Sequence, residues 1–209
     1  MKNLSKRFMY PLIETIKVEN GILKNLPFHQ ERMDKSRHGL LGMMDSISLK
    51  SRLEIPSFAK TGVFKCRVNY GKSVGKVELI VYQPKLVETL KLVIDNDIDY
   101  QYKYSNRKSI DKLLAKKGTC DDILIVKNGL ITDTSYSNII LFDGTNWVSP
   151  DQPLLKGTKR EYLLKVGIVK PKRIKIEGLS KYSQFMLINA MLDLDAGRVL
   201  PIENIMDNN

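Results

Sequence analysis

Lys103 is a residue whose surroundings raise a question of chemistry. It stands in the segment YQYKYSNR (residues 100–107), in which tyrosines occupy every second position. On an extended strand this spacing places the three tyrosines on one face and Lys103 on the other. The pattern is compatible with a solvated lysine at the edge of a sheet and with an amine held in place for a reaction.

Two further positions carry groups that bind anions. Gly157 and Thr158 follow the loop SPDQPLLK and begin an expected helix, whose N-terminal N–H groups and dipole favour a phosphate. Arg32 lies one helical turn after His29 in the segment HQERM. Each has an ordinary alternative, because many helices begin with Gly-Thr and most arginines lie at the surface.

Three polar residues lie within or beside apolar, strand-like runs. Asp133 in GLITDTSYSNIILF is either a turn cap or a carboxylate that pairs with a cationic ring nitrogen. Asp133 lies between two strand-like runs and Asn138 lies on the following one. Asn189 ends the apolar run FMLIN, so both asparagines need hydrogen-bond partners if they are buried. Taken singly, each is better explained by structure than by function.

Taken together, these residue types suit one kind of ligand. A lysine, an arginine, a helix start, a carboxylate and two asparagines match a phosphorylated carbonyl cofactor with a ring nitrogen. Pyridoxal 5′-phosphate has these features. The lysine would bond to the aldehyde, the carboxylate would keep the ring nitrogen protonated, and the helix start and the arginine would hold the phosphate. The combination is chemically coherent.

Two units position these residues, one over 1–85 and one over 86–209. In the first, LIETIKVENGIL predicts a β-hairpin with an Asn-Gly turn, and a helix is expected to begin near Pro27. A short helix over SLKSRLEI and a second hairpin, GVFKCRVNYG with KVELIVYQP, complete an α+β unit.

The second unit is expected to be mostly β. Strands are predicted over TLKLVIDN and DYQYKYS, followed by a helix over RKSIDKLLAKKG. The stretch 121–150 predicts three strands joined by Asn-Gly and Asp-Gly turns, and GTKREYLLKVG predicts a helix. A strand, a helical turn and a final strand are expected over KRIKIEGLSKYSQFMLINA.

Composition limits the class of protein. No run approaches the roughly 18 apolar residues of a membrane span, and the N-terminus lacks the apolar stretch of a signal peptide. Cys66 and Cys120 are far apart and outside any CxxC motif, so we expect a cytoplasmic protein. With only two histidines, a histidine-rich metal site is not expected. The formal charge of +11 is spread along the chain, and aromatic residues are not interleaved with the basic ones. Nucleic acid is therefore not the expected main partner. A preference for anionic small molecules explains the charge equally well.

The order of these motifs resembles the class IV pyridoxal-phosphate aminotransferases, a group that includes branched-chain and D-amino acid aminotransferases and 4-amino-4-deoxychorismate lyase. FHQERM is similar to the HxxRL motif of that family, and KYSNR resembles the catalytic-lysine segment of the lyase, with Asn and Arg three and four positions after the lysine. The resemblance extends over nearly the whole chain, in family order. The remaining matching segments are PLIETIKVENGIL, ITDTSYSNIILF, WVSPDQPLLKGTKREYLL and LINAM.

The resemblance implies an α+β protein with the two-domain architecture of D-amino acid aminotransferase, known as fold type IV. A small α+β domain would precede a larger β-rich pseudobarrel domain, with the cofactor between them and a homodimer as the assembly. Lys103 would carry the cofactor and move the substrate proton. The other implied cofactor residues are Arg32, Asp133, Leu155, Gly157, Thr158 and Asn189, with Arg107, Asn138 and Lys159 as further candidates.

Some positions depart from the family pattern. The family's opening strand pair is represented only by KRFMYPLIETI, which implies a small domain shortened at its N-terminus. Asp133 stands where the family mostly has Glu, and Lys159 stands where transaminases often have a phosphate-binding Thr. Arg107 falls near the tyrosine that transaminases place beside the phenolic oxygen of the cofactor.

The resemblance leaves the activity open among three possibilities. We favour the lyase, which gives 4-aminobenzoate and pyruvate for folate synthesis, on the motifs KxxNR and INAM. A branched-chain or D-amino acid transaminase is the alternative. The shortened N-terminus and Asp133 also leave room for a cofactor-binding homologue that does not catalyse.

Overall fold

The computed structural model describes residues 11–207 and divides them into two compact units. The first covers the chain up to Gln83 and also takes in Tyr102–Asn106. The second consists of Pro84–Gln101 and Arg107 onwards. The predicted division placed Lys103 in the second unit, whereas its segment is grouped with the first. Residues 1–10, including the part KRFMY of the segment KRFMYPLIETI, lie outside the described residues.

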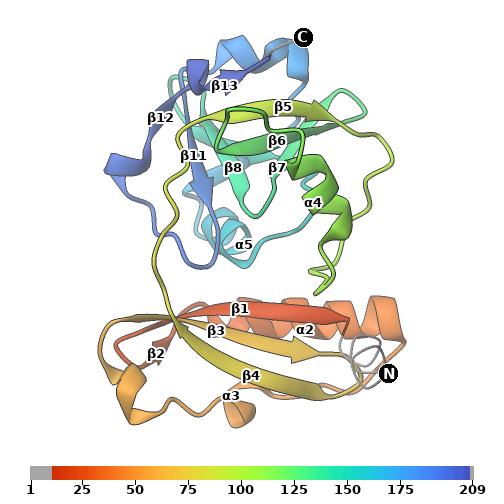
Figure 1. Ribbon diagram of the computed structural model, residues 1–209, viewed down its shortest axis with the longest axis vertical. Helices are drawn as coiled ribbons and strands as arrows, with labels where there is room; N and C mark the ends of the chain where they lie inside the picture. Colours follow the sequence, from red (N-terminus) through yellow and green to blue (C-terminus); the bar gives the residue numbers. More distant parts are fainter. Residues whose placement is uncertain (1–10, 208–209) are drawn as a thin grey trace. The chain divides into compact units, whose positions relative to one another are not determined.

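The first unit is built on a four-stranded antiparallel sheet in the order β2-β1-β3-β4, with the helix α2 beside it (Figure 1). Asn20 and Gly21 both adopt positive φ, which closes the predicted Asn-Gly hairpin. Pro27 lies in the first turn of α2 as expected. The elements are β1 (Leu12–Glu19), β2 (Ile22–Leu23), α2 (Leu26–Leu41), α3 (Leu49–Arg52), η1 (Ser57–Lys60), β3 (Val63–Tyr70) and β4 (Val74–Val81).

Even-numbered residues of β1 face the core of this unit. Leu12, Ile16 and Val18 are fully buried and pack with Met33 of α2 and other apolar side chains. This burial is the main force that holds the sheet and helix together. Glu14 lies on the same face of β1 as these apolar residues and is also fully buried.

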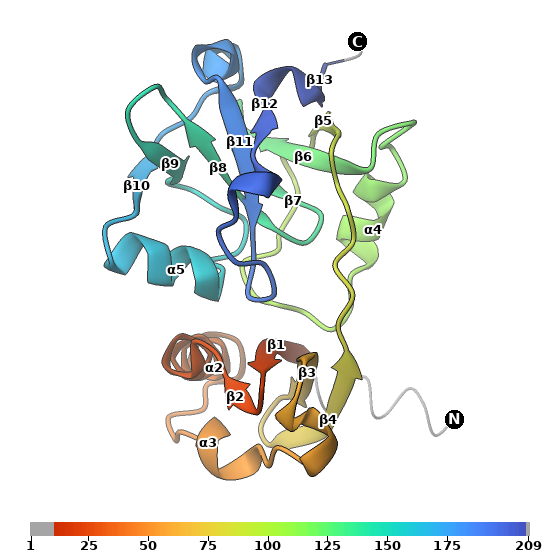
Figure 2. The ribbon, with the colours of Figure 1, turned by 90° about the vertical axis from the view of Figure 1, so that its left-hand side faces the viewer.

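The second unit contains a nine-stranded sheet in which β8 has three neighbours (Figure 2). β8 pairs with β11 along all five residues, with β7 at Asn138 and with β9 at Leu141 and Phe142. The strands are β5 (Leu90–Ile94), β6 (Asp122–Lys127), β7 (Leu130–Thr134), β8 (Asn138–Phe142), β9 (Trp147–Pro150), β10 (Val169–Lys172), β11 (Gln184–Ile188), β12 (Leu200–Pro201) and β13 (Ile205–Met206). The helices are α4 (Lys108–Leu114), α5 (Thr158–Lys165), η2 (Ile176–Lys181), η3 (Ala196–Arg198) and η4 (Ile202–Asn204).

Three strand predictions were wrong. The strand expected at KRIKI lies earlier, at β10, and the two overlap only at Lys172. The stretch 121–150 forms four strands, because a tight turn over residues 135–137 separates β7 from β8; the N–H of Thr134 donates to the Ser137 carbonyl at 2.9 Å. The segment DYQYKYS is irregular apart from one bridge between Tyr104 and Leu12. There the Tyr104 N–H donates to the Tyr102 carbonyl, a local bond that interrupts an extended ladder. The alternation argument for Lys103 therefore does not apply.

None of the helices within residues 11–207 is long and apolar enough to cross a membrane.

Candidate functional site

Asp133, Asn138 and Leu155 form one hydrogen-bonded group in the second unit. The turn between β7 and β8 brings Asp133 opposite Asn138, whose Nδ2 donates to Asp133 Oδ1 at 2.7 Å. The Leu155 N–H donates to Asp133 Oδ2 at 2.8 Å, and Asn138 Nδ2 also donates to the Leu155 carbonyl at 2.9 Å. Three predicted residues from separate segments thus share one network, which fixes the plane of the carboxylate.

The Asp133 carboxyl is electrostatically ready for a cationic partner. It is 5% exposed, and burial raises its pKa to about 6 against the opposing effect of the Leu155 N–H and the Asn138 amide. No ion pair reaches Asp133 among residues 11–207. The charge of Arg160 lowers the pKa of Asp133 without an ion-pair contact, so a protonated ring nitrogen would complete the site. The residues present therefore fit the pyridine end of pyridoxal phosphate.

Gly157 and Thr158 start the helix α5 beside this network. Gly157 is the N-cap residue, and a Cβ at this position would overlap Asn138 Oδ1. Glycine is thus required for close packing of the helix start on Asn138. The first turn of a helix has N–H groups without carbonyl partners inside the helix, which is the feature that favours a phosphate.

Two basic residues of α5 are held by other parts of the second unit. Lys159 Nζ forms an ion pair with Asp193 at 2.9 Å. Arg160 is 4% exposed and donates to Ser149 Oγ and to the Pro150 carbonyl at 3.1 and 2.7 Å. Arg160, which the sequence argument did not single out, ties α5 to β9 and so sets the direction of the helix.

Asn189 and Arg107 both contact the turn between β7 and β8. Asn189 Nδ2 donates to Ser137 Oγ at 2.9 Å, and its Oδ1 accepts the N–H groups of Met191 and Leu192. Arg107 Nη2 donates to the Ser135 carbonyl at 2.9 Å. The structure therefore brings these two residues to the turn that holds Asp133, and every candidate of the second unit belongs to this region or to the α5 start.

The first unit contains a second polar group, formed by Glu14, His29 and Arg32. Arg32 donates through Nε to Glu14 Oε1 at 2.9 Å and through Nη2 to Glu14 Oε2 at 2.5 Å. His29 Nδ1 lies 2.7 Å from Glu14 Oε2. Glu14 and His29 are fully buried, while the Arg32 side chain is 13% exposed. A two-pronged contact of this kind fixes the guanidinium plane.

Lys103 belongs to the same unit as this group. Its carbonyl accepts the N–H of Ile13 at 3.0 Å, next to Glu14 on β1. Tyr102 packs against α2 at Gly39, where any Cβ would overlap the tyrosine hydroxyl. The segment around Lys103 is thus held to β1 by the Lys103 carbonyl and to α2 by the Tyr102 side chain.

The charges of the first group are set by burial and by ion pairs. Burial raises the pKa of Glu14, but Arg32 and His29 outweigh it and hold the pKa at about 2. Burial lowers the pKa of His29; the Glu14 carboxylate opposes this effect, while the charges of Arg32 and Lys103 add to it. Near neutral pH the group therefore combines an ionised Glu14, a neutral His29 and a charged Arg32.

Glu14 was missed by the sequence argument, although a signal was present. The run LIETIKVE places Glu14 on the same strand face as Leu12 and Ile16, where a solvent-exposed carboxylate is not expected. A charged residue on a buried face requires a partner, and Arg32 was already a candidate. His29 was noted only for its spacing from Arg32.

Comparison with known proteins places this chain in a family. Residues 87–202 match the family described as amino-transferase class IV. A protein of Haemophilus influenzae, described as uncharacterized, is 38% identical over 185 residues, which is 88% of this chain and 98% of the relative.

Two solved structures are similar to this chain in fold. A crystal structure from Haemophilus somnus, whose name carries 4-amino-4-deoxychorismate lyase as a proposed activity, has a TM-score of 0.84. It is 35% identical and covers 88% of this chain and 98% of its own. A hypothetical aminotransferase from Mycobacterium tuberculosis in a pyridoxal-phosphate-bound form has a TM-score of 0.73 at 14% identity, covering 95% of this chain and 85% of its own.

The chain belongs to the class IV aminotransferase family and has the fold type IV architecture that the resemblance implied. It is a pyridoxal-phosphate-dependent enzyme, as that family is.

Proposed function

We propose that this protein is a 4-amino-4-deoxychorismate lyase, which converts 4-amino-4-deoxychorismate into 4-aminobenzoate and pyruvate for folate synthesis. The observation that carries the proposal is the 35% identity, over 98% of its length, to the Haemophilus somnus protein whose name gives this activity. The buried Asp133 supports the cofactor part of the proposal.

Pyridoxal phosphate supplies an electron sink that stabilises negative charge on the substrate carbon attached to its nitrogen. Asp133 would hold the charged ring nitrogen, and the Asn138 amide and the Leu155 N–H would keep the carboxylate aimed at it. Arg32 and the start of α5 would hold the phosphate. Leu155 would pack on the ring.

Lys103 would act first as the nucleophile towards the cofactor aldehyde and then as a base. As a base it would take the proton from the ring carbon of the substrate that bears the amino group. Elimination of the enol side chain then makes the ring aromatic, and the enol fragment takes up a proton to become pyruvate. Atoms and electrons balance without water, an oxidant or a second substrate.

The test is product analysis on the purified protein supplied with pyridoxal phosphate. We expect pyruvate and 4-aminobenzoate from aminodeoxychorismate in the absence of any keto acid. We also expect borohydride to fix the cofactor covalently on Lys103, detected by mass spectrometry of the peptide. Lys103→Ala should lose both results, whereas Lys116→Ala, at an exposed lysine, should keep both. Pyruvate release by the Lys103→Ala protein would contradict the assignment.

A branched-chain or D-amino acid transaminase is the alternative, because the matching family is named for that reaction. It predicts amino transfer that depends on 2-oxoglutarate and no pyruvate from aminodeoxychorismate alone. Cofactor binding with neither reaction would instead identify a homologue that does not catalyse.

A homodimer is also proposed, following the family resemblance. Light scattering on the purified protein should give about twice the chain mass of 23.9 kDa. A mass equal to one chain at micromolar concentration would refute the dimer.

A further inference from the structure

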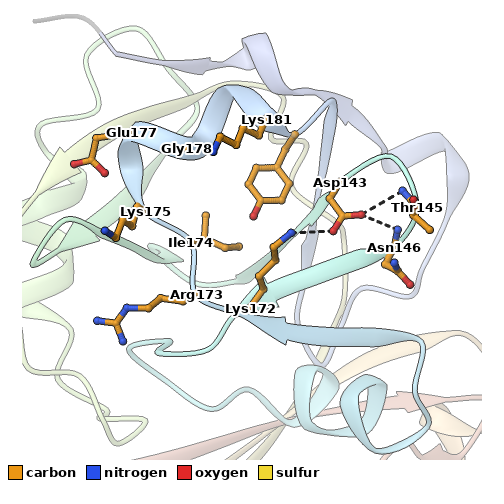
Figure 3. A pocket seen from close by; sticks show the side chains of 11 residues that line it. Asp143, Thr145, Asn146, Lys172, Arg173, Ile174, Lys175, Glu177, Gly178 and Lys181 are labelled. Carbon is orange, nitrogen blue, oxygen red and sulfur yellow. Dashed lines mark hydrogen bonds and ion pairs between the residues drawn. The ribbon is translucent and has the colours of Figure 1, made fainter.

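A cavity lies in the second unit, at a distance from the Asp133 group. It has a volume of about 780 Å³ and lies between the turn that follows β8 and the segment that runs from the end of β10 through η2 (Figure 3). Its walls come from residues 143–146 and from residues 172–182, so the chain folds two distant segments around it. We call this cavity the basic pocket.

The basic pocket is separate from the candidate cofactor residues. Asn138 is the first residue of β8, and Asp143 directly follows its last residue. A strand rises about 3.3 Å per residue, so Asn138 and Asp143 are roughly 17 Å apart along β8. None of the residues that line the pocket belongs to the Asp133 group or to the α5 start.

The pocket carries excess positive charge. Four basic side chains (Lys172, Arg173, Lys175 and Lys181) and two acidic side chains (Asp143 and Glu177) line it, so its formal charge is four minus two, or +2. Lys172 and Asp143 form an ion pair at 3.0 Å.

The Asp143 carboxylate is already fully engaged inside the pocket. The N–H of Asn146 and the Lys172 ammonium, together with the N–H of Thr145, lower the pKa of Asp143 to about 2. Asp143 therefore neutralises the charge of Lys172. Of the residues that line the pocket, Glu177 alone is left to oppose the other three basic side chains. Within residues 11–207 none of Arg173, Lys175 and Lys181 forms an ion pair.

Protection of a sheet edge does not explain all of these charges. β10 is the last strand on its side of the sheet, and Lys170, Pro171 and Lys172 block further pairing there. Lys175 and Lys181 lie outside β10: Lys175 precedes η2 and bridges to Leu130 of β7, and Lys181 is the last residue of η2. Edge protection at β10 therefore does not account for the place of these two lysines at the pocket wall.

The shape favours a small molecule. A volume of about 780 Å³ lies within the usual range of roughly 300–1,000 Å³ for small-molecule sites. Ile174 and the ring of Tyr182 form an apolar wall, and the Lys172 ammonium lies 5.5 Å from the ring centroid. Tyr182 is only 7% exposed, so it offers no platform on which nucleic-acid bases would stack.

We propose that the basic pocket binds a small polyanion that carries two or more phosphate groups. Lys175 and Lys181 contact the anionic groups, Arg173 contributes at the rim, and Lys172 is positioned by Asp143. Lysine ammonium groups bind phosphate as point charges, which suits a flexible chain of phosphates. The proposal does not depend on the reaction at Lys103.

The experiment is calorimetric titration of the full-length protein with inorganic triphosphate, in the presence of saturating pyridoxal phosphate so that a cofactor phosphate site is already filled. We expect the double variant Lys175→Ala/Lys181→Ala to weaken triphosphate binding by about 10-fold or more, since each lost contact is worth a few-fold. A matched control, Lys112→Ala/Lys116→Ala, removes the same charge from exposed positions of the second unit and should stay within about 2-fold of wild type. Equal melting temperatures would show that both variants fold.

Several results would overturn the proposal. Equal weakening in both double variants would mean that general surface charge attracts the anion. Tighter binding of citrate than of triphosphate would identify a carboxylate site instead. Tighter binding of an oligonucleotide, lost in the pocket variant, would identify a nucleic-acid surface, and no triphosphate binding to the wild type would exclude the site.

Discussion

Glu14→Gln should destabilise the first unit by an amount that depends on pH. Glutamine keeps the size and shape of glutamate, so the change removes chiefly the charge beside Arg32 and His29. The pKa of Glu14 is held at about 2 against an ordinary value of 4.5. This difference corresponds to about 3 kcal/mol of stabilisation by the ionised form.

The sign of the pH effect follows from the lowered pKa. The contribution of Glu14 is fully present above pH 4.5 and is lost as the pH falls towards 2, because the carboxylate becomes protonated. Glu14→Gln should therefore lower the free energy of unfolding by about 3 kcal/mol at pH 7, similar to the effect of breaking a buried ion pair. The deficit should shrink steadily between pH 4.5 and the lowest pH at which the wild type folds.

Urea unfolding of the cofactor-free protein at several pH values measures this difference. Glu78→Gln is the matched control in the same unit, since Glu78 pairs with Lys76 at 2.6 Å on the surface of the protein. Exposed pairs contribute little, so the control should remain close to wild type throughout. A deficit below about 1 kcal/mol at pH 7, or one that does not change with pH, would refute the ionised Glu14 pair.

Three further predictions concern the candidate cofactor residues. Asp133→Asn should gain stability relative to the cofactor-free wild type by up to about 3 kcal/mol as the pH rises from 4 to 7, because the raised pKa of about 6 means that ionised Asp133 opposes folding. The loss of a hydrogen bond should offset this gain by an amount that does not change with pH. A difference in the free energy of unfolding, measured in urea, that does not depend on pH would contradict the reasoning. Gly157→Ala should lower the free energy of unfolding by about 1–3 kcal/mol and weaken cofactor binding, measured by absorbance titration, because the added Cβ would displace Asn138. The control Gly178→Ala, where a Cβ meets no atom within 4 Å, should be tolerated. Equal effects of the two variants would exclude this contact. Arg32→Lys should weaken cofactor binding by about 10-fold or more, since an ammonium cannot reproduce the two-pronged contact with Glu14 that orients the guanidinium. Unchanged affinity would remove Arg32 from the phosphate site.

The sequence determined most of the local structure. Asn20-Gly21 and Asn128-Gly129 adopt the positive φ angles that a two-residue hairpin turn requires, so these hairpins could be predicted without the fold. Pro27 marked the first turn of α2 in the same way. The order of motifs along the chain was sufficient to indicate the family.

Tertiary structure decided how the candidate residues meet. The strand expected around Lys103 failed because the pairing of that segment with β1 is limited to one bridge and a few hydrogen bonds, which periodicity does not reveal. Three strands were predicted over 121–150, yet a further turn over residues 135–137 makes four and brings Asp133 against Asn138. Leu155 reaches the same carboxylate from 22 residues further along the chain.

The buried partners show the same division. The position of Glu14 on an apolar strand face indicates that it has a partner, because burying an isolated charge is energetically unfavourable. Which residues would satisfy it depended on α2 packing against β1, which brings Arg32 and His29 within hydrogen-bond distance of the carboxylate. The sequence alone thus identified the residue types and the family order of the motifs. The contacts that set the charge and orientation of these residues depend on packing between segments far apart in the chain.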